Sequence, residues 1–326
     1  MAARPLPRFA CRLNSMGAQP DRMGWQHKPT TVDLIARLGT VEGITAVELN
    51  YPQHLDGHDP EALADAAHQA GLPITSVNLR FPDDPFLEGN LTNPKPEIRD
   101  AAVELVVNAA ATARRFGAPA VTMWLDKDGW DYPFQVDHAA VWEYLLDGLG
   151  RIVRAAPDMR FSIEYKPNEP RAFSTLGNFG LTMHAIRSVG AANLGVRLDF
   201  CHVLMARESP GQVAALAQRD DKLFGIDFND GYGLADDGLM IGSVNATATL
   251  EFVWYLYRSN FDGVVYFDTF PIREDPVAEA AENVRRFTVL WHTVADLEAN
   301  DLSALLTEQA TMQTQRLLFD AIWQRP

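Results

Sequence analysis

Eight short runs rich in β-branched and aromatic residues alternate along this chain with eight longer segments of helical periodicity. The runs cover 8–13, 44–50, 73–80, 119–125, 160–166, 195–201, 223–229 and 263–269. The helical segments cover 30–39, 60–71, 96–117, 137–156, 178–190, 210–219, 245–260 and 276–297. Such alternation indicates βαβ units and a parallel sheet. Eight units predict an α/β fold in which residues 1–297 close into a (β/α)8 TIM barrel.

A doubly wound open sheet is the competing α/β architecture. That fold usually carries a glycine-rich phosphate-binding turn after its first strand, and no Gly-x-Gly-x-x-Gly motif occurs here. The barrel is therefore favoured. Residues 298–326 follow as a helical C-terminal extension with many large apolar side chains. Such a tail must be buried on its own barrel or on a neighbouring subunit. We favour the neighbour, and hence a homo-oligomer, a dimer or a tetramer.

The chain is acidic, with 43 Asp and Glu residues against 28 Lys and Arg and a formal net charge of −15. This balance argues against nucleic acid or an anionic membrane surface as a partner. No apolar run reaches 18 residues, so no membrane span is expected. Only two cysteines occur, which excludes a disulfide framework and favours a cytoplasmic location.

Four consecutive predicted strands each end in a carboxylate, namely Glu164, Asp199, Asp227 and Asp268. In a TIM barrel these ends meet on one rim, where the chemistry occurs. Each close pair of like charges costs about 4 kcal/mol at an effective dielectric constant near 20. A single lysine does not balance four acids, so the pattern predicts a bound divalent cation.

Further polar residues lie near the same strand ends. His202 follows Asp199, and Asp236 lies in the loop after 223–229. Carboxylates with one imidazole suit Mn²⁺, Mg²⁺ or Co²⁺, and we expect Mn²⁺. Lys166 shares a strand face with Glu164 and is predicted to hold a substrate oxygen, or else to form an ion pair. Asn229 likewise shares the face of Asp227 and is a candidate substrate-binding residue.

Four aromatic residues fall in or beside strand-end loops: Trp25, Phe86, Trp124 and Trp130. Such rings pack against the C–H face of a sugar, although an aromatic residue near a barrel rim is as often part of the core. Trp124 and Phe86 are the candidates for substrate contact.

Several segments resemble the xylose isomerase family. The run from Ser162 to Arg171, SIEYKPNEPR, is similar to its metal-binding strand. The segment 222–229, KLFGIDFN, resembles another ligand strand, as does Phe267-Asp268 with Pro271 and residues 273–275. The segment VTMW at 121–124 resembles the strand that places a tryptophan beside the sugar. Segments 198–202 and 235–242 are more similar to bacterial L-rhamnose isomerases. The resemblance covers about 8–297, and the tail resembles the family's oligomer-forming arm.

The resemblance implies two divalent metals at the rim. Its first metal would be held by Glu164, Asp199, Asp227 and Asp268. Asp199 would bridge to a second metal held by His202 and Asp236. That second metal would assist a hydride shift between C1 and C2 of the sugar. Lys166 would bind the carbonyl oxygen at C1, and Trp124 would shield the site from water.

This chain departs from the family pattern at three positions. Gly238 replaces the second carboxylate of an Asp-x-Asp-Leu motif, for which Asp237 is a candidate substitute. Asp199 replaces the bridging glutamate. Asn50 replaces the histidine that opens the sugar ring, and His54 is a candidate replacement four residues later. Asn50 and His54 are therefore candidate substrate-binding residues, and one or two metals per subunit are expected.

The predicted function is that of a divalent-metal-dependent aldose–ketose isomerase acting on an unphosphorylated sugar. A ketose 3-epimerase on the same barrel is one alternative. Such an epimerase holds its metal through Glu, Asp, His and Glu. Here the third and fourth of these places are taken by Asp227 and Asp268, which disfavours the epimerase. A metal-dependent lyase or dehydratase, and a non-catalytic sugar-binding protein, remain further alternatives.

Overall fold

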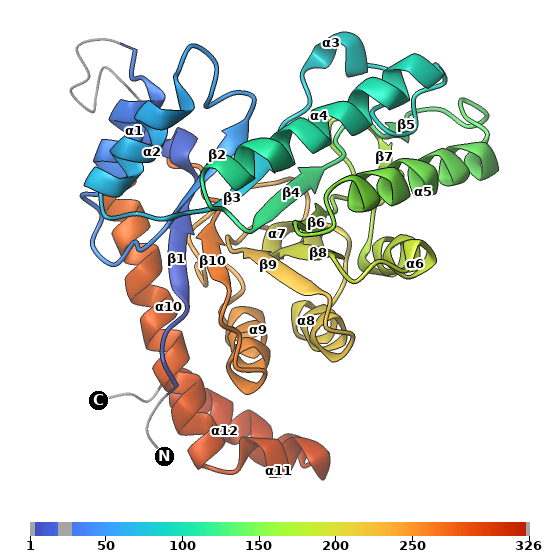
Figure 1. Cartoon of the computed structure of the whole chain (residues 1–326). Helices are drawn as coiled ribbons and strands as arrows, with labels where there is room; N and C mark the ends of the chain where they lie inside the picture. The colour runs from blue at the N-terminus through green and yellow to red at the C-terminus, as the bar shows by residue number, and fades with distance from the viewer. Residues whose placement is uncertain (1–3, 19–27, 324–326) are drawn as a thin grey trace.

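The computed structural model describes residues 4–18 and 28–323 and contains a sheet of eight parallel strands (Figure 1). Their order is β1-β10-β9-β8-β6-β4-β3-β2. The strands are β1 Arg8–Cys11, β2 Val47–Tyr51, β3 Ile74–Leu79, β4 Ala120–Trp124, β6 Arg160–Glu164, β8 Leu194–Asp199, β9 Leu223–Asp227 and β10 Val264–Phe267. The two end strands also meet, because the Phe9 carbonyl accepts the backbone N–H groups of Thr45 and Ala46 at 2.9 and 3.0 Å. The predicted TIM barrel is confirmed, and the open sheet is excluded.

Eight helices cover the outside of the barrel in the predicted order (Figure 1). They are α1 Thr31–Leu38, α2 Pro60–Gln69, α4 Pro96–Arg115, α5 His138–Ala155, α6 Phe179–Val189, α8 Pro210–Arg219, α9 Ala246–Arg258 and α10 Pro276–Ala299. Side chains of Asp59, Asp137, Ser209 and Asp275 accept backbone N–H groups at four of their N-termini. Gly190 ends α6 with φ 69°, a left-handed conformation that glycine adopts without strain.

Several short elements were not predicted: the 3-10 helix η1 Leu13–Gly17, α3 Asp83–Phe86, α7 Phe200–Met205, β5 Gly129–Trp130 and β7 Phe173–Ser174. β5 and β7 pair antiparallel. All five elements follow the carboxyl end of a barrel strand. The connections at this rim are therefore the elaborated ones, as expected where a TIM barrel carries its site.

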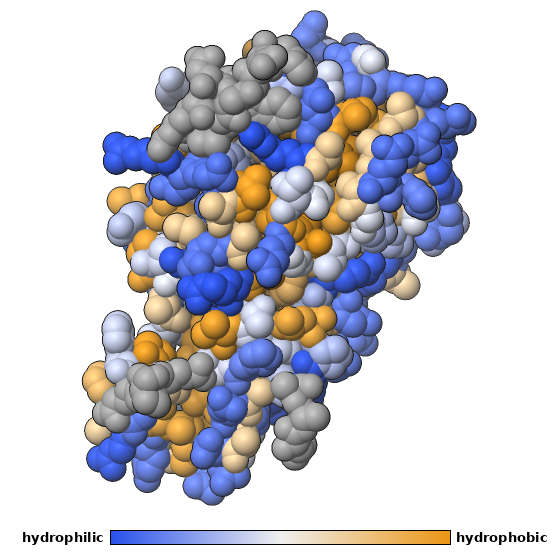
Figure 2. All heavy atoms as spheres, turned by 90° about the vertical axis from the view of Figure 1, so that its left-hand side faces the viewer, coloured by the Kyte–Doolittle hydropathy of each residue, from blue (hydrophilic) through white to orange (hydrophobic). Residues whose placement is uncertain are grey.

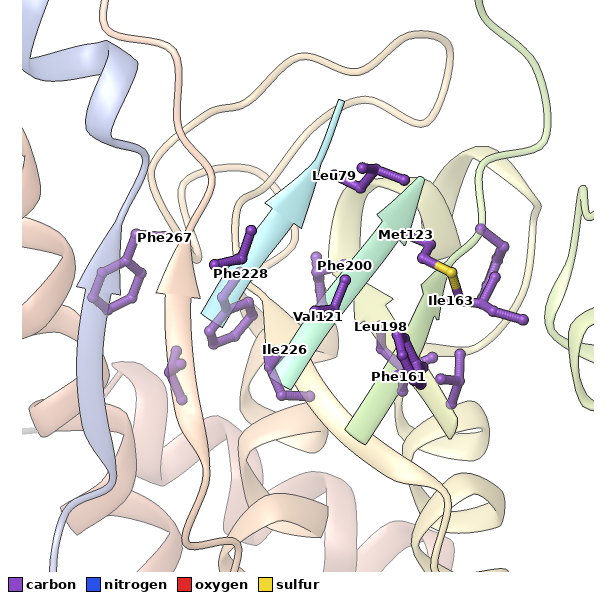
Figure 3. Close-up of a cluster of buried hydrophobic side chains, with 14 of the residues drawn as sticks. Leu79, Val121, Met123, Phe161, Ile163, Leu198, Phe200, Ile226, Phe228 and Phe267 are labelled. Atoms are coloured by element: carbon purple, nitrogen blue, oxygen red, sulfur yellow. The ribbon is translucent and has the colours of Figure 1, made fainter. Parts of the chain in front are cut away.

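Alternate residues of each strand face opposite sides of the sheet. One set packs outward against the helices, and Figure 3 shows members of it from β3, β4, β6, β8 and β9 with Phe267 of β10. The other set lines the barrel interior and is mostly polar. Glu48 of β2 contacts Arg197 of β8 across the interior at 2.9 Å, although these strands are not neighbours. The apolar core thus lies outside the sheet and leaves the interior free for charged residues.

The C-terminal extension forms α11 Leu302–Thr307 and α12 Thr311–Trp323, beside α9 and α10 (Figure 1). Leu302 is buried, whereas Met312, Phe319 and Trp323 are exposed. Figure 2 shows apolar side chains on the lower part of the molecule, where this arm lies. Packing on a neighbouring subunit stays a prediction. No helix in the described part of the chain is long and apolar enough to cross a membrane, and the cytoplasmic location stays a prediction.

Candidate active site

Three of the predicted metal ligands come together at the rim. Ligand atoms of Glu164, Asp199 and His202 all lie within 4.8 Å of one another. Glu164 ends β6 and Asp199 ends β8, and all three residues are buried. Asp199 also caps α7, because its Oδ1 accepts the backbone N–H of His202 at 2.9 Å. This cap fixes the first turn of α7 and so places the imidazole one turn above the carboxylate.

The His202 ring is held at both nitrogens. Nδ1 lies 3.0 Å from the Tyr165 carbonyl oxygen, and Nε2 lies 3.2 Å from Asp236 Oδ2. Burial lowers the pKa of His202, but Asp199 and Asp236 outweigh it and raise the pKa to about 9. Burial and the neighbouring acids Asp236 and Glu164 raise the pKa of Asp199 to about 7, against the opposing effect of His202. A bound cation would favour the carboxylate and the neutral imidazole.

A cavity of about 380 Å³ opens beside these residues. Its walls are Arg12, Asn14, Gln53, Arg80, Trp124, Glu164, His202, Asp236, Asp268 and Phe270. Asp236 Oδ1 and Asp268 Oδ1 are buried without a hydrogen-bond partner among the described residues. Buried oxygens of this kind normally have a partner. The grouped ligand atoms of Glu164, Asp199 and His202 fit a hard or borderline divalent cation. Asp236 and Asp268 line the same cavity but are not in that group, and Arg12 Nε lies 3.5 Å from Asp268 Oδ1.

Asp227 is placed differently from the other predicted ligands. Arg197 Nε lies 2.7 Å from both of its carboxylate oxygens, and Arg197 Nη2 lies 2.5 Å from Oδ1. Nη2 is also 2.9 Å from Glu48 Oε2, and Nη1 donates to Thr122 Oγ1 at 3.2 Å. The structure therefore pairs Asp227 with a guanidinium and does not group it with Glu164, Asp199 and His202.

Lys166 is buried at the edge of the cavity. Its Nζ donates to Asp236 Oδ2 at 3.0 Å, lies 2.9 Å from Glu169 Oε2 and lies 5.2 Å from the centre of the Trp124 ring. Burial lowers the pKa of Lys166, but these two acids outweigh it and the pKa is raised. The side chain is an ammonium between two cavity-lining residues. Lys166 therefore forms ion pairs; it contacts two of the cavity walls but is not itself among them, and its contact with substrate stays a prediction.

The other predicted substrate contacts divide into two groups. Trp124 lines the cavity. Asn229 lies behind it, where Nδ2 donates to Asp199 Oδ2 and to the Asp268 carbonyl. Phe86 is buried against Phe81, with ring centroids 5.3 Å apart, and is not among the cavity walls. Its contact with substrate stays a prediction. Trp130 stacks on Phe173 and is likewise not among these walls, and Trp25 lies outside the described residues.

His54 and Asn50 form a hydrogen-bonded unit behind the cavity wall. His54 Nδ1 accepts the Asn50 backbone N–H at 2.9 Å, so its Nε2 carries the proton and donates to Asn14 Oδ1 at 2.8 Å. Burial, followed by Arg80 and Arg12, lowers the pKa of His54 to about 4. Asn50 Nδ2 donates to Gln53 Oε1. The wall itself is formed by Asn14 and Gln53, which the sequence analysis did not single out.

The sequence analysis also missed the arginines. Arg12 follows β1 and Arg80 follows β3, so both lie at the same rim as the acids. Arg12 Nε is 3.5 Å from Asp268 Oδ1, and Arg80 stacks over Trp124 at 5.2 Å. The premise that one lysine faces the acids was therefore wrong. The signal was available, because Arg197 stands between apolar residues of a buried strand and the other two directly follow strands. The case for a metal now rests on ligand geometry and unpartnered oxygens.

The loop that carries Asp236 explains the departure at Gly238. Asp230 Oδ2 accepts the backbone N–H groups of Val244 and Asn245, which ties the loop ends together. Asp237 Oδ2 accepts the Tyr232 backbone N–H at 2.7 Å, and Asp237 is neither a cavity wall nor among the grouped ligands. Gly238 has φ 56°, and a Cβ there would lie 2.3 Å from the Phe270 ring. No side chain fits at this position.

Two curated xylose isomerases are similar in sequence to this chain. The xylose isomerase of Thermus thermophilus is 29% identical over 220 residues, which cover 64% of this chain and 56% of that protein. The xylose isomerase of Thermus caldophilus is 28% identical over the same shares. The chain thus matches little more than half the length of these relatives.

Solved structures share the fold. A D-tagatose 3-epimerase-like protein superposes with a TM-score of 0.69 at 16% identity, over 87% of this chain and 98% of the other. A D-psicose 3-epimerase in the presence of D-fructose superposes with a TM-score of 0.65 at 16% identity, over 88% of this chain and 99% of the other. The E. coli 3-keto-D-glucoside 4-epimerase gives 0.63 at 15%, over 79% and 93%.

A sequence profile described as "Xylose isomerase-like TIM barrel" matches residues 32–288, which include the strands that end in Glu164, Asp199 and Asp227. On this match, the chain belongs to the xylose isomerase-like TIM barrel family.

Proposed function

We propose that this protein is a divalent-metal-dependent aldose–ketose isomerase acting on an unphosphorylated sugar. The observation that carries the proposal is that one cavity is lined by Glu164 and His202 of the grouped ligands together with Asp236 and Trp124, the two residues that the Lys166 ammonium contacts. The reaction moves a hydride from C2 to C1 while O2 loses a proton and O1 gains one. Carbonyl polarisation, a cationic donor and exclusion of water are its main requirements.

Glu164, Asp199 and His202 would hold the cation, and Asp236 and Asp268 on the same cavity wall are further candidate ligands. Mn²⁺ is the expected ion, with Mg²⁺ or Co²⁺ as alternatives. When bound, a divalent ion supplies Lewis-acid polarisation of substrate oxygens. We propose one ion for each subunit, because Arg197 engages Asp227 and no side chain fits at Gly238.

The roles proposed for the chain's own groups follow from their contacts. Lys166 would donate an N–H to the substrate oxygen at C1 and stabilise the negative charge that develops there. Asp236 orients both Lys166 and His202 through Oδ2. Trp124 covers the Lys166 ammonium and would exclude water from it. Asn229 orients Asp199, and is therefore a positioning residue.

Turnover of a sugar panel in D₂O by Mn²⁺-loaded protein tests the reaction. We expect one aldose to give a ketose whose transferred hydrogen is largely unexchanged. A ketose 3-epimerase is the second candidate, favoured by the structural similarity to such enzymes. It would invert C3 and incorporate deuterium there. A lyase or dehydratase would change the product mass.

Lys166→Ala separates an enzyme from a sugar-binding protein. We expect the variant to keep its metal and lose turnover, since Lys166 is not among the grouped ligands. Lys127→Ala is the matched control, because Lys127 pairs with Asp83 and Asp126 and is not among the cavity walls. Absence of turnover by the wild-type protein with every metal and sugar would favour the binding role.

We also propose a homo-oligomer, a dimer or a tetramer, assembled through residues 298–326. Met312, Phe319 and Trp323 leave an exposed apolar surface on α12. Phe319→Glu should dissociate the oligomer in sedimentation velocity experiments, whereas Asp320→Lys on the same helix should not. A monomeric wild-type protein would contradict this assembly.

A further inference from the structure

Arg80 presents an unused guanidinium at the candidate active site. It follows β3 directly, lines the cavity and lies over the Trp124 ring, with its guanidinium carbon 5.2 Å from the ring centroid. Its backbone N–H donates to the Tyr51 carbonyl, which fixes the residue at the rim. The side chain is thus held at the same aromatic residue that Lys166 contacts.

The guanidinium has no acceptor among residues 4–18 and 28–323. No described carboxylate lies within 4.0 Å of it, and Glu164 and Asp268 act on it only at longer range. The other two arginines of the site differ, because Arg197 contacts two carboxylates and Arg12 lies 3.5 Å from Asp268. Five N–H donors therefore remain for a ligand.

The charges on the cavity walls indicate what kind of ligand fits. Glu164, Asp236 and Asp268 supply three carboxylates, and Arg12 and Arg80 supply two guanidinium groups. Arg12 pairs with Asp268 at 3.5 Å, so Arg80 is the guanidinium on these walls whose donors stay unused among the described residues. An anionic group on the ligand would pair with that guanidinium, whereas a neutral sugar would not.

We propose that Arg80 binds a carboxylate of the substrate, so that the site acts on a sugar acid. The inference rests on the proposed sugar isomerase and specifies its substrate class. A planar guanidinium matches a carboxylate with two parallel hydrogen bonds. A phosphate dianion would need a second free cation, and Arg12 is engaged by Asp268. The cavity of about 380 Å³ is of a size typical of small-ligand sites.

Calorimetric binding to the Mn²⁺-loaded full chain tests the inference with matched pairs: D-glucuronate and D-glucose, D-galacturonate and D-galactose, D-mannuronate and D-mannose. In at least one pair we expect the acid to bind ten-fold or more tightly than the neutral sugar. Raising the salt concentration should weaken binding of the sugar acid and leave binding of the neutral sugar unchanged. Arg80→Met should remove the preference by weakening the acid ten-fold or more beyond any loss for the neutral sugar, and Arg80→Lys should keep part of it.

Arg160→Met is the matched control. Arg160 also stacks on an aromatic ring, Phe224 at 4.2 Å, but it begins β6 at the opposite end of the barrel. Equal binding of acid and neutral sugar in every pair overturns the inference, as does an equal loss of both in Arg80→Met. Tighter binding of D-glucose 6-phosphate than of D-glucuronate would contradict a carboxylate as the group that Arg80 binds.

The inference and the proposed function fail in different ways. No acid preference in a protein that converts neutral sugars rejects the inference alone. An acid preference without conversion of any sugar rejects the isomerase alone. If Arg80→Met does not fold, Arg80→Gln and the salt dependence of the wild-type protein give the same decision.

Discussion

Two clusters of buried charges lie side by side in the barrel and are built from the same kinds of residues. The Arg197 cluster comprises Glu48, Arg197 and Asp227. The His202 cluster comprises Glu164, Asp199, His202, Asp236 and Asp268. Asp199 and Asp227 are partners in the register of β8 and β9, so the clusters meet at neighbouring strands. They differ in where the positive charge comes from.

In the Arg197 cluster the chain supplies its own cation, and no buried oxygen of Glu48 or Asp227 lacks a partner. In the His202 cluster Asp236 Oδ1 and Asp268 Oδ1 are buried without a hydrogen bond to any described residue, although Arg12 Nε lies 3.5 Å from Asp268 Oδ1. Leaving a buried charged group unpaired is costly. The two clusters therefore differ in their cation. Arg197 pairs with both acids of its own cluster, although its Nη2 makes no well-aligned hydrogen bond, and we propose that a ligand completes the His202 cluster.

The largest effect should follow from Glu164→Gln, which removes a charge from the His202 cluster without changing its shape. We expect Mn²⁺ affinity to fall by more than the roughly 10–100-fold typical of outer partners of a metal ligand. Turnover should fall by on the order of 10³-fold, since the ion would polarise the substrate. Calorimetric Mn²⁺ titration and initial rates provide the two measurements.

Glu208→Gln is the control for that change. Glu208 accepts hydrogen bonds from Tyr165 Oη and from the Phe179 backbone N–H, and glutamine can keep both. It adjoins the same strand as Glu164 but is not among the grouped ligands. Equal losses in the two variants would show that Glu164 is only structural.

Disrupting the Arg197 cluster should instead lower the free energy of unfolding. Arg197→Met leaves Glu48 and Asp227 buried without their cation, which should cost about 3–5 kcal/mol of unfolding free energy. Arg197→Lys should cost less, because the charge remains. Urea denaturation midpoints measure both effects.

The same variant tests the number of metal ions. Freed from Arg197, Asp227 becomes available as a ligand, so Arg197→Met should bind a second equivalent of Mn²⁺ and regain stability with it. The wild-type protein should bind one. Two equivalents on the wild-type protein would remove the distinction between the clusters.

The sequence predicted the barrel because local patterns determine it. Eight β-rich runs, the apolar helix faces and polar N-caps such as Asp59, Asp137 and Asp275 act over a few residues. The short elements at the rim escaped prediction because they are only two to six residues long. Their sequences are too short to show a period.

For the site, strand ends predicted which acids reach the rim but not which cation each one meets. Asp227 and Asp268 follow the same pattern, yet Arg197 contacts only Asp227. That contact depends on side chains crossing the barrel interior between strands distant in sequence. Asp237 shows the same limit, since its hydrogen bond to Tyr232 depends on the loop conformation.

The pH dependence of the free energy of unfolding tests the electrostatic environment of His54. The pKa of His54 is about 4 in the folded protein and near 6.5 when unfolded, because of burial and then Arg80 and Arg12. The neutral form is favoured by folding, so His54 contributes full stability above pH 6.5. That contribution declines as the pH falls toward 4, by up to about 3 kcal/mol. Urea midpoints of wild type and His54→Gln should converge over this range. Parallel curves would contradict the assignment.

The smallest effect is expected at Asn229, and it shows whether this residue orients the metal ligand Asp199 or only supports the fold. Asn229 donates to Asp199 Oδ2 and the Asp268 carbonyl, and accepts the Cys201 backbone N–H. Asn229→Ala should weaken Mn²⁺ binding by about 10–100-fold, because Asp199 loses its orienting partner. Asn193→Ala also removes part-buried hydrogen bonds, to three carbonyls between the end of α5 and the start of β6. It should lower stability and leave Mn²⁺ affinity unchanged. If both variants lose stability alone, Asn229 supports the fold, and the completeness of the His202 cluster does not depend on it.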